Sequence, residues 1–286
     1  MNFRQALKEA EETLSAADID DALLESEVLL MHALKVDRVK LYIDTDNELT
    51  PHQYEEFFTL VQRRLKGEPS AYITGNREFY GLDFYVNQHV LIPRPETELL
   101  VDKAIDMAKK RSYKIIVDSG TGSGVVAVCL ALNLPDAVIY ATEISSRALE
   151  VASRNSRVHN VQDRITLLEG NLLEPLPGPV DMIVGNLPYV KNADMRQVNT
   201  YGYEPEAALN GGADGLEYII AIGRQSVSKL LRGGSILLEV GQGQSQAASR
   251  QLKRIYPYGE LDIFRDLAGI ERVVSLSLPQ RIRLFS

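Results

Sequence analysis

The sequence predicts an α/β protein, with a small all-α helical bundle and a β-hairpin linker placed before a larger domain built on a parallel sheet. Three observations support this prediction: helical periodicity in residues 1–75, short aromatic runs in residues 76–92, and alternating strand-like and helical stretches in residues 93–286. The chain of 286 residues exceeds the usual size of one domain, about 100 to 150 residues, so a second, smaller domain is expected.

Residues 1–75 repeat apolar side chains at the spacing of packed helices. Two faces stand out, one with Phe3, Leu7, Ala10 and Leu14 and the other with Leu24, Val28 and Met31. A third helix is predicted to begin at Thr50, since Pro51 suits the first helical position and Gln53 completes a capping box. Gly67 is expected to end this helix.

The same region carries nearly all of the net charge. Residues 1–75 hold 8 Lys and Arg against 15 Asp and Glu, in a chain whose net charge is −8 and whose pI is near 5.2. A negatively charged protein repels the phosphates of nucleic acid, so no direct contact with nucleic acid is expected. The acidic residues are either solvated faces of the helical bundle or a docking surface for a protein partner, and both interpretations stay open.

The composition also bears on location and on metal chemistry. No apolar run approaches the roughly 20 residues that a bilayer requires, and the N-terminus lacks an apolar signal core, so we expect a cytoplasmic protein without a membrane partner. Cys129 is the single cysteine and lies in an apolar stretch, which predicts a buried thiol and not a nucleophile. The four histidines do not cluster, so no metal site is expected.

The pattern changes after Gly75. Two short aromatic and β-branched runs flank Gly81, which predicts a hairpin and a domain boundary in residues 76–92. From residue 93 onward, apolar strands alternate with helical stretches, as in a parallel α/β sheet. The predicted strands are Lys114–Val117, Ala137–Ala141, Ile165–Leu168, Met182–Val184 and Ser235–Val240.

A glycine-rich loop follows the first of these strands, at residues 118–124, and an apolar helix follows the loop. This order of strand, turn and helix is typical of Rossmann-like domains that bind adenosine-type cofactors, because glycine lets the backbone approach the ligand. The second strand is expected to end near Glu143, whose carboxylate can accept hydrogen bonds from both ribose hydroxyls. The cofactor-binding residues predicted here are Gly120, Thr121, Gly122, Ser123, Gly124 and Glu143.

An NAD-dependent oxidoreductase is the main competing interpretation of this loop. Such enzymes space their glycines G-x-G-x-x-G, whereas Gly120, Gly122 and Gly124 follow G-x-G-x-G. No histidine, and no pair of lysine and tyrosine, is evident for hydride transfer. The loop could also be a tight turn that binds no ligand.

A second motif, Asn186-Leu187-Pro188-Tyr189, follows the fourth strand, and ligands bind at that edge of such sheets. A planar amide or aromatic amine nitrogen is a poor nucleophile, so two acceptors must hold its two N–H groups and aim it. Asn186 Oδ1 and the Leu187 carbonyl can do so, while Pro188 has no N–H and Tyr189 offers a flat face for stacking. These four residues are the predicted catalytic residues, although Asn and Pro would also suit a simple turn at the end of a strand.

With these motifs the chain resembles the glutamine-N5 methyltransferases of the HemK/PrmC family, which modify the Gly-Gly-Gln motif of peptide chain release factors. The resemblance covers nearly the whole length. The matching stretches are Pro93–Glu98, Gly120–Gly124, Glu143, Asn186–Tyr189, Glu204-Pro205 with Ala208-Leu209, Gly211–Leu216 and Asp266–Arg272.

The resemblance implies the domains, the cofactor and the partner. Residues 1–75 would be a helical bundle that recognises the release factor, residues 76–92 a hairpin linker, and residues 93–286 a Rossmann-like, seven-stranded class I methyltransferase domain. S-adenosylmethionine is the expected cofactor, with Asn171, Leu172 and Asn186 added to the residues that contact it. The expected partner is a peptide chain release factor, and a monomer is expected.

Two positions depart from the family pattern. Leu187 stands where proline is usual, and ribosomal RNA adenine dimethyltransferases carry a similar Asn-Leu-Pro-Tyr, so amine methylation of a nucleic-acid base stays possible. Asn171 stands where aspartate is common, although its side-chain oxygen can still accept a hydrogen bond from the adenine amine. Glutamine methylation of a ribosomal protein and a catalytically silent cofactor-binding module also stay open as functions.

Overall fold

The computed structural model describes residues 1–198 and 202–279. The chain forms two compact units, Met1–Asn76 and Arg77–Ser286, each with its own buried apolar core. The end of the predicted catalytic domain, residues 280–286, lies outside the described residues. Within the described part of the chain, no helix combines the length and the apolar character that a membrane span requires.

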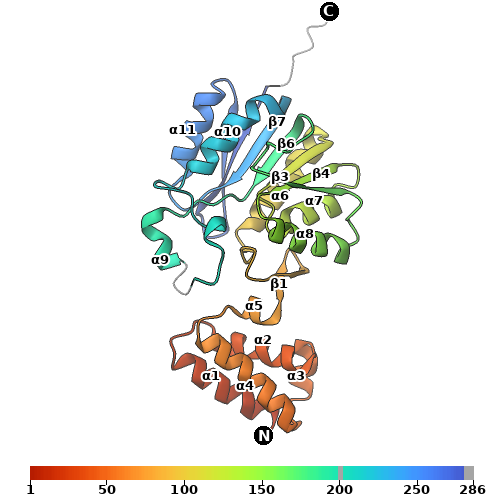
Figure 1. Ribbon diagram of the computed structural model, residues 1–286, viewed down its shortest axis with the longest axis vertical. Helices are drawn as coiled ribbons and strands as arrows, with labels where there is room; N and C mark the ends of the chain where they lie inside the picture. The colour runs from red at the N-terminus through yellow and green to blue at the C-terminus, as the bar shows by residue number, and fades with distance from the viewer. Residues whose placement is uncertain (199–201, 280–286) are drawn as a thin grey trace, which may run out of the picture. The chain divides into compact units, whose positions relative to one another are not determined.

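The N-terminal unit is a bundle of helices (Figure 1). Its helices are α1 (Phe3–Ser15), α2 (Ala22–Leu34), α3 (Arg38–Ile43), α4 (Pro51–Leu65) and α5 (Ser70–Thr74). Helix α4 begins as predicted, because Thr50 Oγ1 accepts from the backbone N–H of Gln53 and the Thr50 N–H donates to Gln53 Oε1. The apolar face predicted for α1 is confirmed, since all four of its members are buried.

The face predicted for α2 is only partly correct, since Met31 packs against the bundle core. Leu24 is half exposed, and the helix instead buries Leu29, Leu30 and Ala33 against the rest of the bundle. The sequence of α2 is apolar on more than one side, so its spacing alone does not select the buried side.

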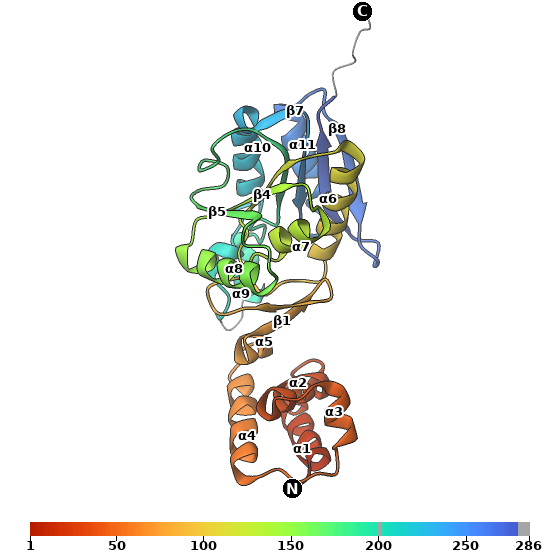
Figure 2. The same ribbon diagram turned by 90° about the vertical axis from the view of Figure 1, so that its right-hand side faces the viewer.

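The predicted hairpin is present as β1 (Asn76–Phe79) and β2 (Leu82–Tyr85). Phe79 and Phe84 are fully buried in the core of the larger unit, Arg77–Ser286, which holds the predicted catalytic domain and is called the catalytic unit below. Helix α8 (Ser146–Val158) lies beside this hairpin (Figure 2). Its Asn155 amide bonds both backbone groups of Tyr85 at 2.9 Å and also donates to the Ser123 carbonyl at 2.8 Å. One buried side chain therefore fixes the hairpin to the glycine-rich loop.

The catalytic unit is built on a seven-stranded sheet with the order β5-β4-β3-β6-β7-β9-β8. The strands are β3 (Ile115–Ser119), β4 (Val138–Glu143), β5 (Ile165–Glu169), β6 (Val180–Gly185), β7 (Leu230–Glu239), β8 (Glu260–Arg265) and β9 (Glu271–Ser277). The first five pair in parallel, as predicted, whereas β9 pairs antiparallel with both β7 and β8. The sheet is thus mixed and not wholly parallel.

Helices cover both faces of this sheet. Helices α6 (Thr97–Arg111) and α7 (Val125–Asn133) share one apolar cluster, and α10 (Glu217–Lys229) and α11 (Ser245–Ile255) share another. Short turns η1 (Asn192–Asp194), α9 (Met195–Val198) and η2 (Glu206–Ala208) follow β6. The strand order reverses at β3, because β4 and β5 follow on one side of it and β6 and β7 on the other, so the crevice at the carboxyl end of β3 is the expected ligand site.

Candidate active site

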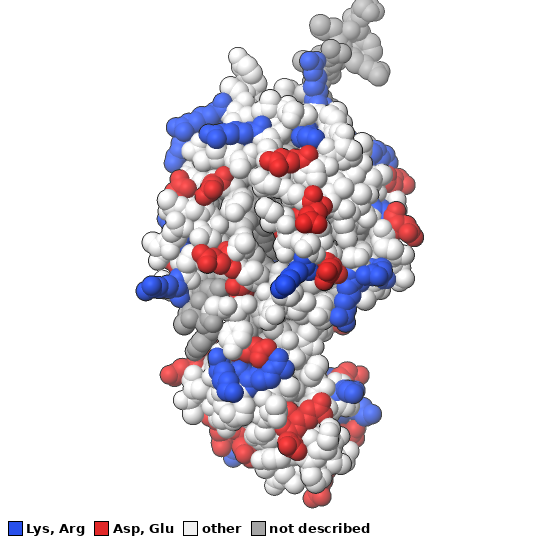
Figure 3. All heavy atoms as spheres, viewed as in Figure 1, with Lys and Arg blue, Asp and Glu red and all other residues white. Residues whose placement is uncertain are grey.

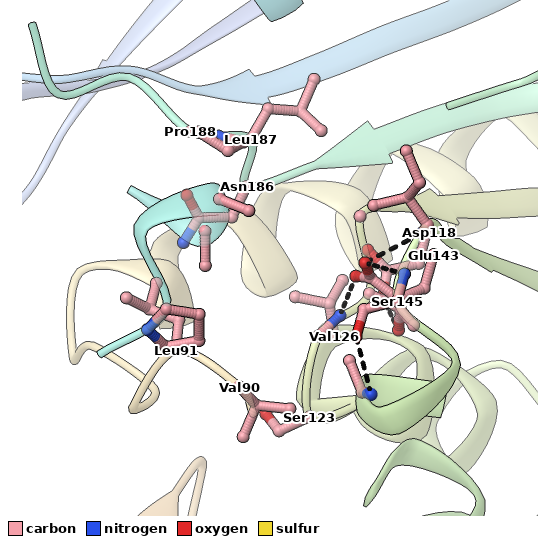
Figure 4. Close-up of a pocket in the computed structure, with 18 of the residues that line it drawn as sticks. Val90, Leu91, Asp118, Ser123, Val126, Glu143, Ser145, Asn186, Leu187 and Pro188 are labelled. Atoms are coloured by element: carbon pink, nitrogen blue, oxygen red, sulfur yellow. Dashed lines mark hydrogen bonds between the residues drawn. The ribbon is translucent and has the colours of Figure 1, made fainter. Parts of the chain in front are cut away.

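A cavity of about 310 Å³ opens at the carboxyl ends of β3, β4 and β6. It brings together most of the residues predicted for the site, namely Gly120, Thr121, Gly122, Ser123, Glu143, Asn171, Leu172, Asn186, Leu187 and Pro188. Figure 4 shows Glu143 and Ser145 on one side of the cavity and Asn186, Leu187 and Pro188 on the opposite side. Parallel strands end at the same edge of the sheet, which is why motifs distant in sequence meet here.

Two predicted residues lie away from the cavity wall. Gly124 instead faces Ala152 of α8, where an added Cβ would come within 3.1 Å of the helix backbone. Tyr189 points toward β7, and its hydroxyl donates to Glu239 Oε1 at 3.2 Å. Burial, with the neighbouring Glu239 carboxylate, raises the pKa of Tyr189 above its usual range, so this hydroxyl keeps its proton.

The glycine-rich loop is held by a buried carboxylate that the sequence interpretation missed. Asp118 Oδ2 accepts from Thr121 Oγ1 at 2.6 Å and from the Ala127 N–H at 3.2 Å. Burial raises the pKa of Asp118 to about 7. The signal was available, because Asp118 is an acidic residue near the end of an apolar strand, two positions before the first glycine of the motif.

Glu143 connects this loop to the start of α8. Its Oε2 accepts from the Gly122 N–H at 3.1 Å, and its Oε1 accepts from the N–H groups of Ile144 and Ser145 at 2.9 and 3.0 Å. These bonds fix the carboxylate at the rim of the cavity, with acceptor capacity left on Oε2. Asn171 lines the same side, and its Nδ2 donates to Glu174 Oε1 at 3.3 Å.

Asn186 directly follows β6, and a hydrogen bond fixes the orientation of its side-chain amide. Its Nδ2 donates to Thr97 Oγ1 at 2.9 Å, so its Oδ1 remains available as an acceptor. Thr97 is only 2% exposed and begins α6, within the Pro93–Glu98 stretch. The sequence interpretation included that stretch in the family resemblance but gave Thr97 no role.

The Leu187 side chain packs beneath the glycine-rich loop. It is 3% exposed, and a Cβ added to Gly120 would lie 3.0 Å from Leu187 Cδ2. The second motif and the loop are therefore in direct contact through this side chain. The residues that line the rest of the cavity and were not predicted include His89, Val90, Leu91 and Tyr218.

The arrangement fits an adenosine-type cofactor at one end and a planar nitrogen nucleophile at the other. The Gly120 and Gly122 backbones, at φ of 71° and 53°, leave the loop open to a ligand, and Glu143 offers a carboxylate beside it. At the other end, Asn186 presents an amide oxygen. An acceptor at this point can orient an N–H group for attack on the cofactor.

Comparison with known proteins agrees with this geometry. Residues 5–75 match the family model described as the PrmC N-terminal domain, and residues 95–201 match the methyltransferase small domain. The chain is 41% identical to a release factor glutamine methyltransferase of Geobacter sulfurreducens, over 91% of each chain. It is 38% identical to a release factor glutamine methyltransferase of Moorella thermoacetica, over 95% of this chain and 97% of the relative.

Solved structures extend the likeness to the fold. The catalytic domain of human METTL16, in complex with an RNA hairpin, has a TM-score of 0.57 at 19% identity and covers 74% of this chain and 81% of that one. At this identity the likeness concerns the fold alone. It supports the class I methyltransferase architecture that the sheet order describes.

Proposed function

Since the chain belongs to the family of release factor glutamine methyltransferases, we propose that it methylates the side-chain amide nitrogen (N5) of the glutamine in the Gly-Gly-Gln motif of a peptide chain release factor. It is an S-adenosylmethionine-dependent protein-(glutamine-N5) methyltransferase. The observation that carries the proposal is the amide of Asn186, whose oxygen is left free to accept an N–H at the cavity opposite Glu143. A substrate that acts at the ribosome agrees with a cytoplasmic location.

The chain contributes orientation to the reaction. When bound, S-adenosylmethionine supplies a methyl group attached to a sulfonium. Asn186 Oδ1 and the Leu187 carbonyl would accept the two N–H groups of the substrate amide and aim its nitrogen at that methyl carbon in line with the carbon–sulfur bond. In such a transfer a nitrogen–carbon bond would replace the carbon–sulfur bond, and the nitrogen would then release its extra proton to solvent. Pro188 has no N–H that competes for the substrate.

Mass spectrometry of a release factor after incubation with the enzyme and S-adenosylmethionine tests the proposal. We expect one added methyl group on the tryptic peptide that contains Gly-Gly-Gln, on its glutamine. Ribosomal proteins and ribosomal RNA serve as parallel substrates. Methylation of either of these, with none on the release factor, would replace the proposed substrate.

Glu143→Ala is expected to weaken binding of S-adenosylmethionine by roughly 10- to 150-fold, since hydrogen bonds to a charged acceptor are worth about 1.5 to 3 kcal/mol. The variant would lose the hydrogen bonds to the ribose and also the three that Glu143 accepts from the backbone. Both losses weaken the binding of S-adenosylmethionine. Calorimetry measures the affinity. Glu169→Ala is the matched control, because it removes the same charge at the end of the adjacent strand β5. Equal affinities in the two variants would refute the assignment of Glu143.

We also propose that the N-terminal unit docks the release factor. Its surplus of acidic over basic residues suits a basic protein surface. Figure 3 shows acidic side chains spread over one face of this unit, together with several groups of basic side chains. The unit has its own apolar core, as does the catalytic unit, so each has the means to fold by itself.

Deletion of residues 1–75 should therefore leave a catalytic unit that folds and binds S-adenosylmethionine. Methylation of the intact release factor should fall about tenfold or more, the loss that corresponds to roughly 1.4 kcal/mol of docking free energy. A short peptide containing Gly-Gly-Gln should be methylated equally by the truncated and the full chain. If the truncated enzyme modifies the intact release factor at the full rate, the N-terminal unit is not a docking module.

A further inference from the structure

Gln244 joins the Asn186–Tyr189 motif to the turn that follows β7. It is 8% exposed and immediately precedes helix α11. Its Oε1 accepts from the Gly241 N–H at 2.9 Å, and its Nε2 donates to the Tyr189 carbonyl at 2.9 Å. The same Nε2 donates to the Asp214 carbonyl over a longer distance, 3.4 Å. One buried amide therefore connects three separate segments of the chain.

The partners of this amide determine its direction. A backbone N–H only donates, so the Gly241 N–H selects Oε1, and a carbonyl only accepts, so the Tyr189 carbonyl selects Nε2. The main chain of Gln244 is also held in place. Its N–H donates to the Gly241 carbonyl at 3.0 Å, and its carbonyl accepts from the Ala248 N–H at 2.9 Å. A side chain with one donor and one acceptor, at the length of glutamine, meets both requirements.

Glycines surround the main chain of Tyr189 and let Gln244 reach it. A Cβ added to Gly211 would lie 2.6 Å from Tyr189 Cα, and one added to Gly241 would lie 2.8 Å from Gln244 Oε1. A Cβ added to Gly215 would overlap both the Tyr189 carbonyl oxygen and Gln244 Nε2. The hydrogen bond from Gln244 to Tyr189 therefore lies in a space that admits no further side chain.

This hydrogen bond bears on the proposed acceptor two residues earlier. The Asn186 side chain is held at the beginning of the motif, and Gln244 holds the Tyr189 carbonyl at its end. Between them, the ring of Pro188 fixes one backbone torsion. The Leu187 carbonyl lies between the two attachments, so its direction depends on both.

We propose that Gln244 is a positioning residue for methylation, which keeps the Leu187 carbonyl directed at the substrate amide through its hydrogen bond to the Tyr189 carbonyl. The inference rests on the proposed function, since it takes the Leu187 carbonyl as an acceptor for a glutamine N–H. Gln244 does not line the cavity, so its effect reaches the substrate through the motif.

Gln244→Glu changes the donor of this side chain and keeps its size. The ionised carboxylate still accepts from the Gly241 N–H, but it places a second acceptor opposite the Tyr189 carbonyl. When protonated, the acid has a carbonyl oxygen and an O–H donor, as the amide has an oxygen and an N–H. Burial raises the pKa of the introduced group above the ordinary value of about 4.3. The donor is therefore present below the raised pKa and is lost as the pH rises through it.

Two further variants complete the test. Gln244→Met keeps the length of the side chain but forms neither hydrogen bond at any pH. Gln242→Glu is the matched control, because Gln242 is an exposed glutamine in the same turn and gains the same charge.

Single-turnover methylation of a release factor with saturating S-adenosylmethionine, from about pH 5.5 to pH 8.5, gives the rate of each variant relative to the wild type. Gln244→Met should be slower by on the order of 10- to 100-fold at every pH, since a displacement of roughly 1 Å can cost that much. Gln244→Glu should be as slow at high pH and should regain most of the rate as the pH falls. Gln242→Glu should stay near the wild-type rate.

Cofactor affinity, measured by calorimetry, should stay near the wild-type value in all three variants, because neither position lines the cavity. This separates loss of positioning from loss of the cofactor site. A Gln244→Met enzyme at the wild-type rate would overturn the inference, as would a Gln244→Glu enzyme whose relative rate does not change with pH.

A second measurement does not depend on methylation. The ¹³C NMR signal of the Tyr189 carbonyl should show a titration in Gln244→Glu that is absent from Gln242→Glu, with the same midpoint as the relative rate. Identical signals in the two variants would overturn the inference. If the titration is present but the wild-type chain methylates no release factor, the proposed function is wrong and the hold of Gln244 on Tyr189 still stands.

Discussion

Replacing Asn186 with alanine lowers the single-turnover rate of glutamine methylation by roughly 10² to 10³-fold, the usual effect of losing one preorganised hydrogen bond at a reacting group. The variant removes one of the two acceptors that would hold the substrate amide, while the Leu187 carbonyl remains. An amide nitrogen held by one acceptor can rotate out of line with the carbon–sulfur bond, so the loss appears in the rate of the chemical step.

Asn192→Ala is the matched control, because Asn192 is an exposed asparagine on the same connection, just beyond the motif. We expect only Asn186→Ala to lose activity at saturating S-adenosylmethionine, and calorimetry measures the cofactor affinity of each variant separately. An Asn186→Ala enzyme as fast as the control would mean that the substrate amide is held by other groups.

Gly211→Ala is expected to lower kcat/KM by about 10²-fold, the effect that a displacement of roughly 1 Å at a reacting group can have. A Cβ at this position would lie 2.6 Å from Tyr189 Cα and 2.7 Å from the Pro188 carbonyl oxygen. Both are backbone atoms, so no side-chain rotation relieves the contact. The Gly211 N–H also donates to the Val190 carbonyl at 2.8 Å, which holds the two segments together. The catalytic motif must therefore shift.

Gly178→Ala provides the comparison, since an added Cβ there meets no atom within 4 Å. Circular dichroism and thermal unfolding establish that both variants are folded, and steady-state kinetics with the release factor measures kcat/KM. Wild-type kinetics in a folded Gly211→Ala enzyme would show that the motif tolerates displacement and that its position is not what limits methylation.

The sequence predicted those parts of the site that the ends of parallel strands position. The glycine-rich loop, Glu143 and Asn186 each directly follow or end a strand, and parallel strands place such residues at one edge of the sheet. The resemblance then supplied the methyl donor, the substrate and the number of strands, which the residue patterns alone did not give.

What could not be predicted depends on contacts across the sheet. Asn186 directly follows a predicted strand, but the group that orients its amide is Thr97, at the start of a helix distant in sequence. The direction of the Tyr189 side chain depends on another such contact, the hydrogen bond from its hydroxyl to Glu239 at the end of β7. Spacing along the chain does not contain this information, just as it did not select the buried face of α2.

The hydrogen bonds of Asn155 join the hairpin to the glycine-rich loop. They limit where the chain can be cut and fused to parts of other proteins. A recognition module can be exchanged at residue 76, because the hairpin that follows stays attached to α8 by the bonds of Asn155. A junction placed at residue 92 would remove Tyr85 and leave the amide of Asn155 without two of its three partners. Chimeric enzymes should therefore keep the hairpin as part of the catalytic body, and a graft that treats it as a spacer would be expected to lose its cofactor.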